Sequence, residues 1–114
     1  MKVSFEGVKG DLVTFLNQNA AVNTPVKVGA AGTVKKCSEG DEFDGYAVHL
    51  DNGMAAVRLH GLVTAYYSGD TAPGFGTVRL VADGDGGVML AESGGRRCTV
   101  VDKDATEETV TFFM

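Results

Sequence analysis

The sequence predicts an all-β domain, a small glycine-rich β-barrel or sandwich of about eight short strands with an irregular N-terminal arm. Sixteen glycines against two prolines separate many short apolar runs, which is typical of tight turns between short strands. Apolar and polar residues alternate with period two along most of these runs. The dipeptide Asn52-Gly53 lies between two such runs, and this arrangement is a strong hairpin signal.

Length and charge limit the classes of protein that this chain can belong to. Its 114 residues suffice for one domain that buries a modest core without cross-links. The net charge is −5 and no basic stripe is present, so we expect no nucleic-acid partner. No apolar run approaches the roughly 18 residues of a membrane span, so we expect no membrane partner. Glu6 lies where a signal peptide needs apolar residues, which predicts synthesis in the cytoplasm without export.

The first part of the chain is the least regular. We expect residues 1–22 to form an arm or edge strand and residues 23–114 to form the β-barrel domain. Val3 and Phe5 fit a short strand, and the β-branched and aromatic residues within 11–16 favour extended structure over a helix.

Regular alternation begins at Pro25, and glycine-rich or acidic turns then separate the runs. Strands are expected at residues 25–28, 33–37, 45–51, 54–65, 77–81, 88–91, 97–102 and 109–113. The stretch 66–76 holds three glycines and a proline, which predicts a loop. It also holds Tyr66, Tyr67 and Phe75, so this loop either packs back on the barrel or meets a partner.

The hairpin has a register that can be checked. If Asn52-Gly53 is a two-residue type I′ loop, Asp51 lies opposite Met54. One face of the ribbon then carries the pairs Leu50–Ala55, Val48–Val57 and Tyr46–Leu59. The other face carries the pairs His49–Ala56 and Ala47–Arg58. A slip of one residue would mix apolar and polar positions on each face, so the pattern favours this register.

The two histidines fall on the outer face of this ribbon. His49 lies opposite Ala56, and His60 lies opposite Gly45. Their separation along the ribbon is about 13 Å at the usual strand rise. Two ligands of one zinc ion lie within roughly 4 Å of each other, so this pair is expected to be two solvated side chains.

Two glycine-containing motifs resemble ligand loops only in part. Residues 83–87 (Asp-Gly-Asp-Gly-Gly) match the start of a calcium loop, but its twelfth position falls on Gly94 instead of an acid. An Asp- and Gly-rich β-turn explains the same residues. Gly74-Phe-Gly76 is followed by Arg79 where a dinucleotide fingerprint needs glycine, and no helical pattern follows.

No set of residues provides a nucleophile, a base and an acid together. Cys37 and Cys98, in a chain without an export signal, are expected to be reduced thiols packed as small apolar groups, with a disulfide between them as the alternative. The carboxylates gather in turns, where they are usually solvated. We therefore expect no catalytic residue, no cofactor site, no metal site and no enzyme activity.

An order of short strands and glycine turns runs through most of the chain, in the segments 25–28, 32–45, 55–64, 67–73, 80–88 and 98–102. In this order the chain resembles the small decoration, or cement, proteins of tailed bacteriophage capsids. These are glycine-rich β-barrels encoded near the major capsid protein. The resemblance implies a structural protein of a phage or prophage virion that binds the outer surface of the capsid and stabilises the shell. It implies the major capsid protein as a partner and a homo-oligomer, with a trimer favoured.

The contact with such a shell is expected in two places. The N-terminal arm offers Val3 and Phe5, and the aromatic loop offers Tyr66, Tyr67 and Phe75, because aromatic side chains often dominate interfaces. A head–tail joining or tail-associated β-barrel is the alternative within the virion. Outside the virion there are two alternatives. One is a small carbohydrate-binding module that stacks these aromatic rings on sugars. The other is a small enzyme or metal-binding barrel that uses the cysteines and histidines.

Overall fold

The computed structural model describes residues 11–114 as an all-β protein without helices. Its described residues form ten strands in two sheets, one of them a closed barrel, which confirms the predicted fold class. The strands are β1 (Asp11–Asn17), β2 (Thr24–Val28), β3 (Thr33–Lys36), β4 (Gly45–Asp51), β5 (Met54–His60), β6 (Leu62–Tyr66), β7 (Gly76–Ala82), β8 (Val88–Leu90), β9 (Arg96–Asp104) and β10 (Thr109–Phe113). Seven of the eight predicted strands each correspond to one observed strand, and the strand predicted at residues 54–65 is divided into β5 and β6.

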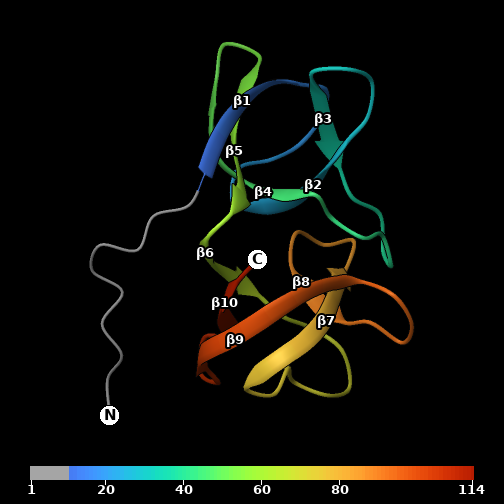
Figure 1. The fold of residues 1–114 in the computed structure, drawn as a ribbon, viewed down its shortest axis with the longest axis vertical. Helices are drawn as coiled ribbons and strands as arrows, with labels where there is room; N and C mark the ends of the chain where they lie inside the picture. Colours follow the sequence, from blue (N-terminus) through green and yellow to red (C-terminus); the bar gives the residue numbers. More distant parts are fainter. Residues whose placement is uncertain (1–10) are drawn as a thin grey trace.

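The first half of the chain forms a closed barrel in the order β1-β3-β2-β4-β5 (Figure 1). β1 closes it by pairing antiparallel with β5 on one side and parallel with the start of β3 on the other. Residues 11–17, part of the segment 1–22 that was expected to be an arm or edge strand, form β1, which has a partner along most of its length on the β5 side only. Residues 1–10 lie outside the described residues.

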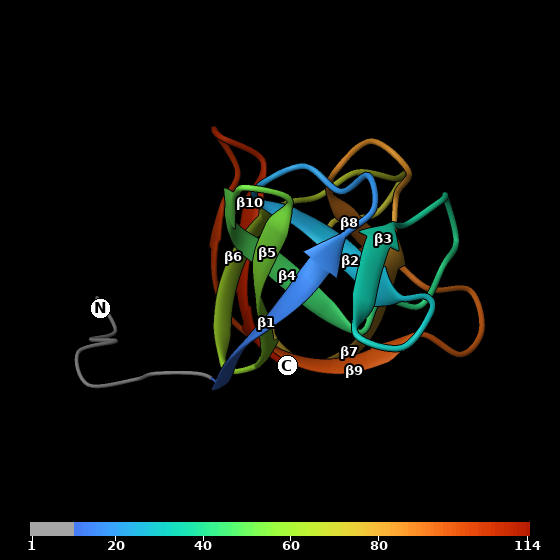
Figure 2. The same ribbon diagram turned by 90° about the horizontal axis from the view of Figure 1, so that it is seen from above.

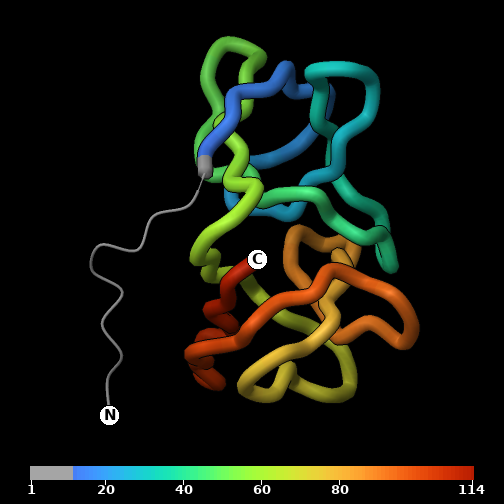
Figure 3. Tube along the Cα trace, in the orientation of Figure 1, coloured from blue at the N-terminus to red at the C-terminus, as the bar shows by residue number. Residues whose placement is uncertain are grey.

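The second half forms a five-stranded sheet in the order β6-β10-β9-β7-β8. Its two outer strands come together at one point, because Tyr67, directly after β6, makes an isolated parallel bridge with Val88 of β8. The sheet therefore curls around its own core below the barrel (Figures 1 and 2). Figure 3 shows the chain leaving the barrel for this sheet after β5.

Two clusters of buried side chains fill these halves. The barrel encloses Ala20, Val26, Val34, Ala47, Ala55 and Val57. The larger cluster fills the second sheet but also takes residues from the barrel half of the chain. It contains Cys37, Phe43, Tyr46, Val63, Ala65, Leu80, Ala82, Val88, Cys98, Val100, Val110 and Phe112. The rings of Phe43 and Phe112 meet with centroids 6.4 Å apart. This shared core joins the two halves into one unit.

The hairpin at Asn52-Gly53 is confirmed, and both residues have the positive φ that a type I′ turn needs, 49° and 76°. The register is confirmed for the pairs Asp51–Met54, Leu50–Ala55 and His49–Ala56. Beyond His49 it is wrong, because Val48 forms a bulge and Ala47 lies opposite Val57. The bulge reverses the alternation. Ala47 therefore faces the barrel core, while Tyr46 faces the core of the second sheet.

Gly61 divides the run that was predicted as one strand over residues 54–65. Its φ of 125° is a conformation that side-chain-bearing residues rarely adopt. The chain turns there and passes from β5 in the barrel to β6 in the other sheet. His60 consequently lies opposite Asp11 of β1 rather than opposite Gly45.

Two side chains fasten the barrel to the second sheet. The Arg96 guanidinium on β9 donates to the carbonyl oxygens of Asp44, at 2.9 Å, and Leu59, at 2.7 Å. The Tyr46 hydroxyl shares its one hydrogen between the carbonyl oxygen of Asn23, at 2.8 Å, and that of Thr64 on β6, at 3.3 Å. Arg96 thus reaches main-chain carbonyls of the barrel half, and Tyr46 reaches Thr64 of the second sheet, so both side chains help to fix how the halves sit together.

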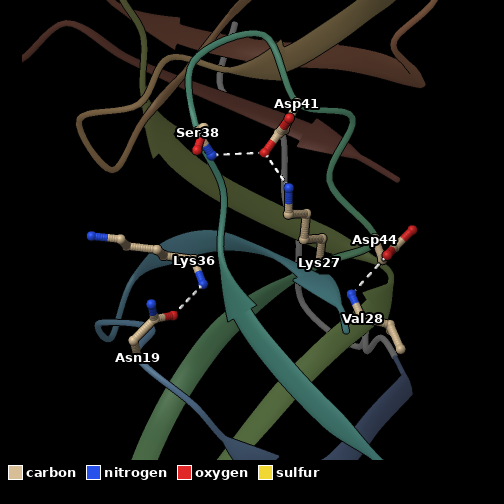
Figure 4. A network of polar contacts seen from close by, with 7 residues as sticks. All are labelled: Asn19, Lys27, Val28, Lys36, Ser38, Asp41 and Asp44. Atoms are coloured by element: carbon tan, nitrogen blue, oxygen red, sulfur yellow. Dashed lines mark hydrogen bonds and ion pairs between the residues drawn. The ribbon is translucent and has the colours of Figure 1, made fainter. Parts of the chain in front are cut away.

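The acidic connection between β3 and β4 makes a third link. The Asp41 carboxylate accepts hydrogen bonds from the Lys27 ammonium and from the Ser38 amide, as Figure 4 shows. The hydrogen bond with Lys27 holds the pKa of Asp41 below its usual value and raises the pKa of Lys27. The main chain of this connection then pairs with Ala82 at the end of β7, through Gly40 and Asp41 at 2.9 Å each. These turn acids thus hold structure together instead of being only solvated.

Candidate functional site

The predicted aromatic loop is anchored at several points and leaves two of its three rings exposed. Tyr66 is the last residue of β6, so the strand extends one residue into the stretch that was predicted as a loop. It lies opposite Thr109 of β10, on the outer face of the sheet, and 62% of its surface is exposed. An exposed tyrosine on a paired strand keeps its backbone fixed and its ring available to a partner.

Tyr67 points the other way, because successive side chains of an extended chain alternate. It is half-buried and packs against the core of the second sheet. Its amide donates to the carbonyl oxygen of Glu108 at 3.0 Å, and it bridges to Val88. Tyr67 is therefore an anchor of the loop, and the structure separates it from the exposed pair Tyr66 and Phe75.

Phe75 stands at the other end of the loop and is 68% exposed. The Lys103 ammonium of β9 lies 5.3 Å from the centre of its ring, a cation–π contact, and donates to the carbonyl oxygen of Pro73 at 3.1 Å. Pro73 itself is buried. The loop is thus tied down beside Phe75, while most of the ring stays open to solvent.

The middle of the loop is held by Asp83, the first residue of the motif that resembles a calcium loop. Asp83 is buried, with 8% of the residue exposed. One oxygen accepts from the amides of Asp85, at 2.7 Å, and Gly87, at 2.9 Å, and the other accepts from the Ser68 hydroxyl at 2.8 Å. Protein donors therefore surround this carboxylate, as the β-turn alternative requires.

A groove of about 740 Å³ lies beside the loop, lined in part by residues 68–71. The cross-strand neighbours Val81 and Met89 lie on it, with the carboxylates of Glu39, Asp70 and Glu92 around them. None of the described residues that line it carries a positive charge. Residues 68–71, which line one part of the groove, lie between Tyr66 and Phe75 in the sequence. The groove is suited to a segment that carries Lys or Arg.

Within the described part of the chain, the two histidines and the two cysteines do not assemble into a chemical site. Among residues 11–114, no group of three His, Cys, Asp or Glu side chains is placed to hold a metal ion. His49 and His60 are both exposed, as expected for solvated side chains. Cys37 and Cys98 are free and buried, and burial raises the pKa of each thiol to about 11. Both thiols are therefore protonated at neutral pH, whereas the nucleophile and metal ligand is the thiolate. Val3 and Phe5 lie outside the described residues.

Lys103 and Asp83 position the aromatic stretch, yet sequence reasoning did not assign them to it. In β9 the register shifts by one residue opposite the Thr111–Phe112 step of β10, so Lys103 lies opposite the buried Val110. Simple alternation from Cys98 and Val100 would place Lys103 on the other face. Asp83 was recognisable as the first acid of an Asp-Gly motif. Its hydrogen bond with Ser68 was not predictable from that motif, because it joins segments that are distant in the sequence.

No family model matches the chain, and no curated protein matches it. Within residues 11–114 no helix is long and apolar enough to cross a membrane.

Proposed function

We propose that this protein is a structural component of a phage or prophage virion that binds the outer surface of the capsid and stabilises the shell. The observation that supports this most directly is the pair of exposed rings, Tyr66 and Phe75, on a stretch fixed to the fold at Tyr67, Ser68 and Pro73. A ring presented from a fixed backbone loses little conformational entropy when a partner covers it.

The proposed partner is the major capsid protein, and Tyr66 and Phe75 are the proposed contact residues, with Val3 and Phe5 of the N-terminal segment as a second contact. The acidic groove at residues 68–71 of the same loop favours a shell surface that carries Lys or Arg at this point. Each copy needs only a modest interface, because many copies bind one shell and the symmetry of the shell repeats every contact. In this proposal the protein is made in the bacterial host cytoplasm and acts on the virion exterior.

Co-sedimentation with shells of the cognate capsid that lack this protein tests the proposal. We expect saturation at a fixed ratio to the capsid subunit and greater resistance of the shell to heat. Tyr66→Ala and Phe75→Ala should each weaken binding by about 2 kcal/mol, close to thirtyfold in Kd, if the rings are central contacts. Val22→Ala is the matched control, because Val22 is also exposed, at 45%, and lies outside the aromatic stretch.

The N-terminal contact needs a deletion that spares the barrel. Removing residues 1–22 would take away β1, so the informative deletion ends at residue 10. Weaker shell binding with an unchanged melting temperature would support a contact through Val3 and Phe5. Absence of binding to both immature and expanded shells would end the decoration proposal. Rings larger than a trimer would then favour the head–tail or tail-associated alternative, and a positive glycan array would favour the carbohydrate-binding one.

A further inference from the structure

β1 has an open edge along most of its length. On one side β5 accompanies it from residue 11 to residue 16. On the other side β3 reaches it only at its end, through the pairs Leu16–Thr33 and Asn17–Val34. Figure 1 shows β1 approaching β3 near the top of the barrel while the beginning of β1 lies away from it. Within residues 11–114, positions 12–15 therefore have a strand neighbour on one side only.

The hydrogen bonds at the end of β1 show which main-chain groups face this open side. The Leu16 amide donates to the carbonyl oxygen of Gly32 at 2.8 Å, on the β3 side. The Asn17 amide donates to the carbonyl oxygen of Gly53 at 2.9 Å, on the β5 side. Because main-chain groups alternate along a strand, the N–H and C=O groups of Leu12 and Thr14 face the same side as those of Leu16.

The side chains along this edge are apolar or neutral and exposed. Leu12 is 53% exposed and Val13 is 40% exposed, and Thr14 is exposed between two neutral neighbours. Residues 12–18 carry no charge and include no proline. Soluble proteins usually protect an edge strand with charge, proline or a bulge, because an unprotected edge pairs with another chain.

We propose that β1 pairs antiparallel with β1 of a second copy of this chain, across a twofold axis at Val13. Leu12 then lies opposite Thr14 of the second copy, and Thr14 lies opposite Leu12 of the second copy. Each of these pairs exchanges two N–H···O=C hydrogen bonds, so both open groups of Leu12 and of Thr14 find partners. The two Val13 residues form the pair between them, and their exposed side chains pack together.

The sequence of the edge suits this self-pairing. A twofold interface brings each residue against the same stretch in the other copy, so charges on it would meet like charges. Residues 12–18 avoid this repulsion because they carry no charge, whereas the chain as a whole has a net charge of −5. The result is one sheet that runs from one barrel into the next through β5, β1, β1 and β5. This arrangement is a dimer and differs from the trimer that the resemblance to decoration proteins implies.

Sedimentation equilibrium of the full chain at roughly micromolar to millimolar concentrations tests the inference. We expect a monomer–dimer equilibrium. Thr14→Pro removes an N–H that has no strand partner in the single copy, and it should raise the dimer Kd about tenfold or more by removing two intermolecular hydrogen bonds. Leu12→Lys should also raise it, by placing charge on the edge. Val22→Lys is the matched control and should leave it unchanged, because Val22 is similarly exposed but lies outside β1.

Amide hydrogen exchange of the unchanged chain locates the interface without any variant. The inference can therefore be tested even if Thr14→Pro does not fold. The amides of Leu12 and Thr14 should become protected as the concentration rises, whereas those of Val13 and Phe15, which face β5, should be protected throughout. A monomer at every concentration, a trimer, or a dimer with freely exchanging Leu12 and Thr14 amides would each overturn the inference. Shells are absent from these experiments, so the result is separate from the proposed decoration function.

Discussion

Replacing Arg96 by methionine should loosen the junction between the barrel and the second sheet. Methionine keeps most of the apolar stem and removes the guanidinium, whose two hydrogen bonds reach the carbonyl oxygens of Asp44 and Leu59. Hydrogen bonds of charged groups contribute about 1.5–3 kcal/mol each, and the partial exposure of Arg96 places these two at or below the lower end. We therefore expect a loss of about 2 kcal/mol in the free energy of unfolding. For a chain of this size that loss corresponds to a fall of about 8 °C in Tm.

Thermal unfolding followed by calorimetry and circular dichroism measures this loss. Arg97→Met is the matched control, because Arg97 is the next residue of β9, is exposed, and donates no side-chain hydrogen bond within the described part of the chain. Its Tm should change by less than about 2 °C, as for most surface substitutions. An equal fall in Tm for both variants, or no fall for Arg96→Met, would refute the role of Arg96 in joining the two sheets.

Two further predictions concern buried polar groups. Tyr46→Phe removes the hydroxyl whose one hydrogen is shared between the carbonyl oxygens of Asn23 and Thr64, and urea unfolding should show a loss of about 1–2 kcal/mol in the free energy of unfolding; an unchanged midpoint would contradict this. Burial raises the pKa of Cys98 from 9.0 to about 11, so its contribution to stability is complete below pH 9.0 and is lost as the pH rises through about 11. The loss in the free energy of unfolding is about 2–3 kcal/mol. Cys98→Ala should therefore make the decline in Tm between pH 9 and pH 11 shallower. Parallel declines for the variant and the natural sequence would be evidence against this contribution of Cys98.

The hairpin and the fold class could be predicted because their causes are local. Asn52 and Gly53 both accept positive φ, and a two-residue turn of that type fixes which residues face each other beside it. The pairs from Asp51–Met54 to His49–Ala56 follow from the turn alone. The abundance of glycine between short alternating runs likewise determines short strands and tight turns without reference to distant segments.

The stretch that carries the candidate site could be predicted, but not which of its rings are exposed. Aromatic residues in a glycine- and proline-containing stretch singled out Tyr66, Tyr67 and Phe75 together, and the pattern did not separate the exposed Tyr66 and Phe75 from Tyr67, which packs on the core. The difference depends on where β6 ends and on the bridge to Val88. Lys103 was missed because a register shift in β9 reverses the face on which it lies. A period of two specifies faces only until the first bulge.

The short strands, the positions of most of them and the turn of the central hairpin follow from the amino-acid sequence. Contacts in the folded chain establish the rest: the strands divide between a closed barrel and a second sheet at Gly61, residues 11–17 close the barrel, and Arg96 and Tyr46 join the halves. The reason is physical. Turns and alternation depend on neighbours in the sequence, whereas barrel closure and hydrogen bonds between sheets depend on pairings between distant residues, which many alternating sequences would satisfy equally well.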